Sequence, residues 1–269
     1  RGANNGSVGS GAVIDGHSTT FRVWAPERRA VDLVLVRPPV DGRGDPAADD
    51  IVRLHRLKKD AEGYWSGQVM GLPAGTLYKF RLDGQDDESL PDPASRYQPF
   101  GVHGPSAVVD PFRFRWSAEE WSATAFDDLS IYELHVGTFT AEGTFRAAAE
   151  QLAALQDLGI TAIELMPVAD FAGSRNWGYD GVALFAPARC YGTPDDLRAL
   201  IDTAHGYGLA VFLDVVYNHF GPDGAYANAF SPYYFTDAHQ SPWGKGVNLD
   251  GERSQDVRRF FIENAVHWV

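Results

Sequence analysis

The second half of the chain alternates apolar strand-like runs with amphipathic helical patterns, and this alternation constrains the fold more than any other feature. The strand-like runs are residues 130–136, 161–168 and 209–216. The helical patterns between and after them are residues 144–159, 193–208 and 254–269. A β-α-β-α-β-α order predicts a parallel sheet covered by its crossover helices. A doubly wound nucleotide-binding sheet needs a glycine-rich turn after its first strand, and HVGTFTAEGT does not provide one. The order therefore favours the first part of a (β/α)8 TIM barrel, with three of its eight strands.

The helical patterns carry their own boundary signals. Thr144 is expected to cap the first helix, and Gly159 to end it. Its expected apolar face consists of Phe145, Ala148, Leu152, Leu155 and Leu158. Thr193 and Pro194 are typical of the start of the second helix. The expected apolar face of the third consists of Val257, Phe260, Phe261, Ala265 and Trp268.

In residues 10–109 the strand-like runs are short and closely spaced, which is typical of an antiparallel sheet. Short strand-like runs broken by Gly, Pro and Asp occupy residues 19–26, 30–38, 63–71 and 76–84. This spacing predicts an antiparallel β-sandwich of the immunoglobulin-like kind. The charged stretch 49–62 is expected to be a solvated loop.

Two segments show no period of either kind. Residues 1–9 are rich in Gly, Asn and Ser, and we expect them to be disordered. Residues 110–128 are expected to form a surface linker between the sandwich and the barrel part, 129–269. Because the chain starts at Arg1 and stops inside a helical pattern, we also expect it to be a fragment.

Charge and cysteine content restrict the partners. The formal net charge is −13, from 23 basic and 36 acidic residues, which argues against nucleic acid and against an anionic membrane surface. The chain has no apolar run of 18 residues and no basic-then-apolar leader. Cys190 is the only cysteine, so a reducing cytoplasm is the expected location.

One acidic residue lies where an acid is costly. Asp214 lies inside the apolar run 209–216, which has the composition of a strand buried on both faces. A carboxylate there loses several kcal/mol of hydration unless a cation or hydrogen-bond donors compensate it. The sequence therefore predicts a partner for Asp214.

Polar and aromatic side chains collect where the three strands end. Glu133 and His135 end the first, and Asp214, Asn218 and His219 follow the third. The loop 171–181, after the second strand, is dense in Trp, Tyr, Asn and Asp. Barrels place their reactive groups at these carboxyl ends, and aromatic faces mixed with hydrogen-bonding groups suit a sugar.

Each piece also has an ordinary structural interpretation. A histidine that ends a strand is often bonded to a nearby carbonyl, and Trp177 and Tyr179 are as consistent with packing as with binding. A metal site is disfavoured because no HExxH-like spacing occurs, and no G-x-S-x-G elbow supports a serine hydrolase. We expect no cofactor and no required metal ion.

Four segments together resemble the α-amylase superfamily of glycoside hydrolases. They are YELHVGTFT (132–140), TAIELMPV (161–168), NWGYDG (176–181) and DVVYNH (214–219). Within that group they most resemble the maltooligosyltrehalose trehalohydrolase family, and glycogen-branching enzymes are the nearest alternative. The specific motifs cover residues 130–269. The first hundred residues resemble, more weakly, the glycan-binding-module-like sandwich of these enzymes.

The resemblance implies a function and a set of roles. It implies retaining hydrolysis of the α-1,4-glucosidic bond next to the terminal trehalose of maltooligosyltrehalose. The residues that it assigns to substrate are His135, Trp177, Tyr179 and His219, and those that it assigns to support are Asp180, Asp214 and Asn218. In this pattern Tyr179 stacks on a sugar and His219 contacts its hydroxymethyl group. Asp214 pairs with an arginine beside the nucleophile on the next barrel strand.

The resemblance assigns no catalytic residue to this chain. Retaining glycosidases use two carboxylates about 5–5.5 Å apart. The family places the nucleophilic aspartate on the fourth strand and the acid/base glutamate on the fifth. Three strands hold neither, so this chain alone is expected to be inactive without the C-terminal part of the barrel.

A rival hypothesis is a non-catalytic protein whose sandwich binds α-glucan. Its candidate surface aromatics are Trp24, Trp65 and Tyr78. All three lie in strand-like runs, where core packing is the favoured interpretation.

Overall fold

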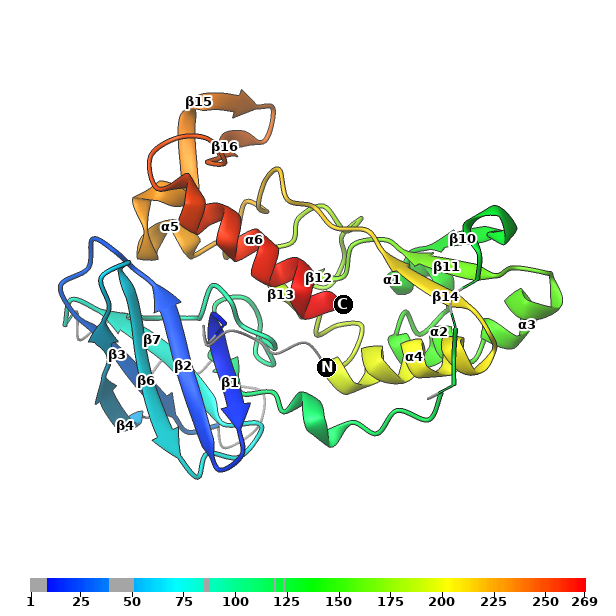
Figure 1. Ribbon diagram of the computed structural model, residues 1–269, viewed down its shortest axis with the longest axis horizontal. Helices are drawn as coiled ribbons and strands as arrows, with labels where there is room; N and C mark the ends of the chain where they lie inside the picture. The colour runs from blue at the N-terminus through cyan, green and yellow to red at the C-terminus, as the bar shows by residue number, and fades with distance from the viewer. Residues whose placement is uncertain (1–8, 39–50, 85–87, 119, 123) are drawn as a thin grey trace.

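A computed structural model describes residues 9–38, 51–84, 88–118, 120–122 and 124–269 (Figure 1). Apart from Gly9, the segment that was expected to be disordered lies outside the described residues. A sandwich forms the N-terminal part of the molecule and a small parallel sheet with its helices the other, and helix α6 (Ser254–Trp268) lies between them (Figure 1). No helix in these ranges is both long and apolar enough to cross a bilayer.

Two antiparallel sheets make up the sandwich, as predicted. The first has the order β1-β2-β6-β5, from β1 (Gly11–Asp15), β2 (Ser18–Trp24), β5 (Lys58–Lys59) and β6 (Tyr64–Met70). The second has the order β4-β3-β7-β8, from β3 (Val31–Val36), β4 (Ile51–Arg56), β7 (Leu77–Leu82) and β8 (Ser89–Leu90). Strand β9 (Ser106–Ala107) also pairs with β7.

The prediction of a loop at 49–62 is wrong for the described part of that stretch, because β4 and β5 lie in it. Strand β4 pairs with β3, and β5 pairs with β6. Both are edge strands whose side chains are mostly exposed, so charged residues cost little there and discourage further pairing. Strands exposed on both faces show no apolar alternation, and the sequence pattern therefore missed them.

The three aromatic residues of the rival glucan-binding hypothesis are buried. Tyr78 and Trp65 belong to the sandwich core, and Trp24 packs edge-on against Tyr234 at a centroid distance of 5.3 Å. They present no ring to solvent, so core packing is their role.

The parallel sheet confirms the predicted start of a barrel. It has the order β10-β11-β14, from β10 (Ile131–Leu134), β11 (Ala162–Leu165) and β14 (Ala210–Leu213). Helices α2 (Phe145–Ala149), α3 (Leu152–Asp157) and α4 (Pro194–Gly206) cover one face of it (Figure 1). Leu134, Ile163 and Leu165 pack against Leu152 and Leu200 in that layer.

The strands are shorter than expected. The first stops at Leu134 because Val136 already begins the short helix α1 (Val136–Phe139). The third covers four residues and is not buried on both faces, since the Phe212 side chain is 41% exposed. Among the described residues only β11 pairs with β14, so one edge and the face opposite the helices stay open.

The first predicted helix is divided in two. Thr144 caps it as expected, through a hydrogen bond from the Ala147 amide at 3.2 Å, and Gly159 ends it with a φ of +90°. The chain turns at Glu150 and Gln151, between α2 and α3, so the expected face rotates and Leu158 becomes exposed. Helix α4 has the predicted cap, completed by Asp196 in a capping box.

Helix α6 connects the two parts of the molecule. Val257, Phe260 and Phe261 join a cluster that also contains Trp24 and Tyr64 of the sandwich. Arg259 Nη1 reaches Glu62 of the sandwich at 2.7 Å. The predicted face is wrong at Ala265, which is exposed.

A polar residue takes the buried position next to Ala265. The Asn264 amide is buried and donates to the Leu184 carbonyl at 2.9 Å. That carbonyl belongs to β13 (Ala183–Pro187), which pairs with β12 (Ala169–Asp170). The apolar periodicity of the sequence does not predict that Asn264 is buried, because it follows hydrophobic residues only. Here a hydrogen bond compensates the burial of the amide.

The segment 110–128 contains the short helices η1 (Pro111–Arg113) and η2 (Phe126–Asp128). It is attached to α4: the Ser117 hydroxyl donates to Asp202 at 2.6 Å, and the Trp121 ring stacks on His205 at 3.9 Å. Residues 214–253 contain α5 (Ala227–Phe230), η3 (Pro232–Tyr234) and a hairpin of β15 (Phe235–Ser241) and β16 (Gly244–Val247).

Candidate active-site rim

The register of the parallel sheet aligns the strand ends. Glu133, Glu164 and Phe212 occupy the same level on neighbouring strands. The ladder continues one step beyond the strands, since the Asp214 amide donates to the Leu165 carbonyl at 2.9 Å. His135 and Asp214 therefore follow the outer strands on either side of β11, about 10 Å apart by strand spacing.

Two histidines hold the loop that follows β11. Nε2 of His135 lies 2.7 Å from the Asn176 carbonyl, and Nε2 of His219 lies 2.9 Å from the Tyr179 carbonyl. A carbonyl oxygen only accepts, so each Nε2 carries the proton. Nδ1 of His135 lies 3.2 Å from the Thr138 hydroxyl, which fixes the orientation of its ring.

The side chains between these two anchored carbonyls point outward. Trp177 is 78% exposed and Tyr179 is 45% exposed. Gly178 between them has a φ of +108°, and a Cβ there would lie 2.8 Å from the Pro167 side chain. Only glycine fits this close turn. The NWGY segment is therefore a rigid turn that presents two aromatic side chains to solvent.

Segment 214–221 lies against the same loop. The Gly221 amide donates to the Gly181 carbonyl at 3.0 Å, and the backbone of Gly221 packs closely on Asp180. The Asp180 and Asn218 side chains are exposed, and the Asn218 side-chain oxygen lies 3.2 Å from Nδ1 of His219. Five of the seven residues proposed for the site are thus on this turn or bonded to it, and Asn218 reaches it only through His219.

Asp214 is the seventh proposed site residue, and its side chain lies outside these contacts. Its side chain is half-buried and has no hydrogen-bond or ion-pair partner among the described residues. The alternation of the strand places Asp214 on the face of Phe212, opposite the helices. The predicted cationic partner is not part of the described chain, so this pairing stays a prediction.

Sequence reasoning missed a different buried acid. The Asp170 side chain is completely buried, and its Oδ1 lies 2.8 Å from Nη1 of Arg189. Arg189 also donates to the carbonyls of Phe171 and Gly173, at 3.0 and 2.8 Å. Burial raises the pKa of Asp170 to about 6, although the Arg189 charge opposes this shift. The pair fixes the start of the loop that carries Trp177 and Tyr179. The available signal was an acid between apolar residues in VADF.

A third exposed aromatic residue was also missed. Trp243, in the turn of the β15–β16 hairpin, is 67% exposed, and its ring stacks on buried His219 at 5.3 Å and 19°. The hairpin is distant in sequence from the barrel strands, so no periodicity could bring Trp243 to this rim. Within the described ranges, no group of three His, Cys, Asp or Glu side chains is arranged to hold a metal ion.

A sandwich followed by parallel β/α units, with a polar and aromatic rim at the strand ends, defines a barrel protein with an N-terminal accessory module. Two family models agree with this. The α-amylase catalytic domain matches residues 108–265, and carbohydrate-binding module 48, the isoamylase N-terminal domain, matches residues 9–112. The chain belongs to the α-amylase family.

Individual relatives within this family are similar to the chain to different degrees. A malto-oligosyltrehalose trehalohydrolase from Deinococcus radiodurans is 51% identical over 97% of this chain. The 1,4-alpha-glucan branching enzyme GlgB of Vibrio parahaemolyticus is 36% identical over 92% of this chain and 34% of its own length. A Salmonella typhimurium crystal structure assigned to the alpha amylases has a TM-score of 0.85 at 43% identity, covering 96% of this chain and 41% of that one. The chain spans 40% of the length of the Deinococcus protein.

Proposed function

We propose that the protein to which this chain belongs hydrolyses the α-1,4-glucosidic bond next to the terminal trehalose of maltooligosyltrehalose. It releases trehalose with retention of configuration, as a step of trehalose biosynthesis. The observation that carries this proposal is the anchored NWGY turn between His135 and His219, beside the open carboxylate of Asp214. The identity of 51% to a trehalohydrolase, against 36% to a branching enzyme, supports the same choice.

In this proposal the rim binds the sugar beside the cleaved bond. Trp177 and Tyr179 stack on glucosyl rings, and His135 and His219 contact hydroxyl groups at the edge of the turn that they anchor. Asp180 and Asn218 brace the turn. Asp214 pairs with an arginine next to the nucleophile and orients it.

The two reacting carboxylates are assigned outside this chain. A nucleophilic aspartate on a fourth barrel strand and an acid/base glutamate on a fifth complete the retaining pair. We propose a cytoplasmic location, because a chain with one cysteine needs no oxidising compartment.

Product analysis of the full-length parent tests the proposal. Incubation with maltooligosyltrehalose should give free trehalose as the first product, with the anomeric configuration retained. New α-1,6 branches on amylose without trehalose would instead identify a branching enzyme. The 269-residue chain, assayed alone, should release no trehalose above the uncatalysed rate, and measurable turnover would contradict the assignment of the carboxylates.

A further inference from the structure

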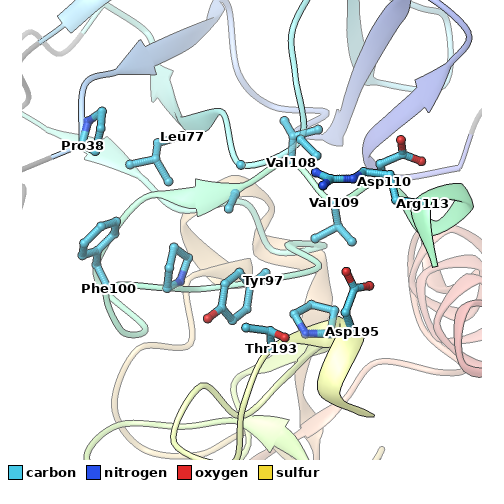
Figure 2. Close-up of a pocket in the computed structure, with 15 residues that line it drawn as sticks. Pro38, Leu77, Tyr97, Phe100, Val108, Val109, Asp110, Arg113, Thr193 and Asp195 are labelled. Atoms are coloured by element: carbon cyan, nitrogen blue, oxygen red, sulfur yellow. The ribbon is translucent and has the colours of Figure 1, made fainter. Parts of the chain in front are cut away.

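Two concave sites lie beside helix α4, and they differ in the charge of their walls. Figure 2 shows the first, a cleft between the sandwich edge and the start of α4, whose lining includes Asp110 and Asp195. The second is a cavity of about 590 Å³ between α4 and the end of α6. Within the described residues no Asp or Glu side chain lines this cavity, although the chain has a net charge of −13. Its size is that of pockets that bind small molecules.

The walls of the cavity are mainly apolar and come from distant parts of the chain. Leu165 of β11 belongs to the wall formed by the parallel sheet, and Ile201 belongs to the side formed by α4. The indole rings of Trp121 and Trp268 line it as well, and the Trp121 ring is held by stacking on His205 at 3.9 Å. Such walls suit a flat apolar group, because rings that are already fixed need no further ordering when a ligand binds.

Two guanidinium groups line the same cavity. Arg96 has no hydrogen bond or ion pair among the described residues, whereas Arg198 binds Asp195 through Nη1 at 2.7 Å and keeps its other donors. Burial lowers the pKa of Arg96, and the charge of Arg198 acts in the same direction. Asp92 and Glu263 oppose this shift, but neither forms an ion pair with Arg96. The positive charge of Arg96 is therefore not neutralised by a bonded partner.

The unpaired polar groups of the cavity wall are donors. Nε of Arg96 and Nε1 of Trp121 are both buried without a hydrogen-bond partner among the described residues. Buried donors are normally paired, so an acceptor beside them would reduce a cost that the folded chain carries. The histidines add no charge at neutral pH, because burial lowers the pKa of His267 to about 4 and also lowers the pKa of His205.

We propose that this cavity binds a small organic anion, with a phosphate or carboxylate group carried on a flat apolar ring. The oxyanion accepts hydrogen bonds from Arg96 and Arg198, since a guanidinium fork matches the geometry of two acceptor oxygens. The ring packs against the apolar wall and the indole rings. A neutral sugar suits the cavity poorly, because it leaves the charge of Arg96 uncompensated and finds no carboxylate to accept from its hydroxyls.

The ligand would contact both parts of the molecule. Arg96 lies in the range that matches the carbohydrate-binding module, and Arg198 lies on α4, in the range that matches the catalytic domain. A molecule that binds only the folded junction stabilises it in proportion to its occupancy. The cavity therefore makes the attachment of the sandwich to the barrel part responsive to a soluble anion.

Calorimetric titration of the 269-residue chain with phenyl phosphate and with benzoate tests the proposal. Benzyl alcohol carries a similar ring without the charge, and inorganic phosphate carries the charge without the ring. At least one of the two aromatic anions should bind about tenfold more tightly than either control and should raise the midpoint of thermal unfolding. The tighter of the two identifies the preferred oxyanion.

Three variants show whether the anion binds at the two arginines. Arg96→Met should weaken binding of the tighter anion about tenfold, because it removes the uncompensated guanidinium. Without ligand it should not lower the unfolding midpoint, since no partner loses a bond. Arg198→Met should weaken binding about threefold, and its partner Asp195 is exposed and stays solvated. Arg29→Met, which removes an exposed arginine outside the cavity, is the matched control and should leave binding unchanged.

Several results would overturn the proposal. They are equal binding of benzyl alcohol, unweakened binding by Arg96→Met, or equal weakening by Arg29→Met. The absence of saturable heat at millimolar phenyl phosphate and benzoate would overturn it as well. Val269 also lines the cavity, so the titration is repeated on the full-length parent, where the following residues lie next to the same site. The parent should bind the anion with similar affinity, and loss of binding there counts against the proposal in the same way.

Discussion

Two aspartates that follow barrel strands in apolar stretches of sequence differ in their burial and in their pairing. Asp170 lies in β12, the short strand after β11, is completely buried and is paired with Arg189 at 2.8 Å. Asp214 follows β14, is half-buried and has no partner in the described part of the chain. The cost of burying a carboxylate is thus partly compensated by Arg189 at Asp170, and exposure keeps it low at Asp214.

The difference separates a structural acid from a candidate functional one. The Arg189 guanidinium donates hydrogen bonds to Asp170 and to the carbonyls of Phe171 and Gly173, so the pair fixes the loop that follows Asp170. Asp214 keeps its carboxylate available on the open face of the sheet. We therefore expect Asp170 to control stability and Asp214 to control activity, and the following variants test this contrast.

The largest effect is expected from Arg189→Met, which leaves the Asp170 carboxylate buried and unpaired. Removing one member of a buried pair costs about 3–5 kcal/mol. Urea unfolding at pH 7 should show a loss of stability of that size. At pH 5 the loss should be smaller, because protonation of Asp170 then removes the unpaired charge.

Lys245→Met is the matched control for Arg189→Met. Lys245 pairs with Asp237 at 2.9 Å, but both side chains are exposed, and exposed pairs contribute about 0–1 kcal/mol. Equal losses in the two variants would show that the Asp170–Arg189 pair has no special structural role.

The next effect is catalytic. In the full-length parent, Asp214→Asn removes the charge expected to orient the nucleophile through an arginine. Misplacement of a reacting group by about 1 Å costs on the order of 100-fold in rate. We expect kcat for trehalose release to fall by that factor, while the free energy of unfolding in urea changes by less than about 0.5 kcal/mol. A normal kcat, or a large loss of stability, would make Asp214 another structural acid.

The sequence could predict the strand order and the strand-end positions of the site, because periodicity and caps are local signals. The sequence predicted a cationic partner for Asp214, and this pairing stays a prediction; the buried acid with a cationic partner in the described chain is Asp170, which the sequence analysis did not single out. Arg189 is 19 residues away, and its carbonyl partners depend on the path of a loop that no period describes. Trp243 was out of reach for the same reason. The break between α2 and α3 shows that an apolar face alone does not establish helix continuity.

The pH dependence of stability gives a third test. Burial raises the pKa of Asp170 to about 6, above its ordinary value near 4. The folded state thus binds a proton more tightly, so this contribution to stability is present below pH 4 and is lost as pH rises through 6. The expected loss is on the order of 2 kcal/mol, and Asp170→Asn should remove it. Unfolding curves from pH 4 to 7 measure the slopes.

His267 provides an opposite control. Burial lowers the pKa of His267 to about 4, so the unfolded state binds more protons and stability rises with pH from 4 to about 6.5. Asp92 in the sandwich, whose pKa burial raises to about 6, acts in the same direction as Asp170. His267→Gln should therefore make the fall in stability steeper, and Asp170→Asn should make it shallower. Slopes that both variants leave unchanged would contradict the assigned shifts.

The smallest effect concerns the aromatic side of the rim near Asp214. Trp243 is exposed and stacks on His219, whose Nε2 lies 2.9 Å from the Tyr179 carbonyl, so we expect its ring to contact a sugar bound at Tyr179. In the full-length parent, Trp243→Ala should raise KM for maltooligosyltrehalose about fivefold with little change in kcat, because stacking binds substrate and transition state alike. Trp116→Ala, which truncates an exposed tryptophan of the segment 110–128, is the control and should leave KM unchanged. If both variants raise KM equally, the effect comes from general surface changes, and Trp243 does not belong to the binding face.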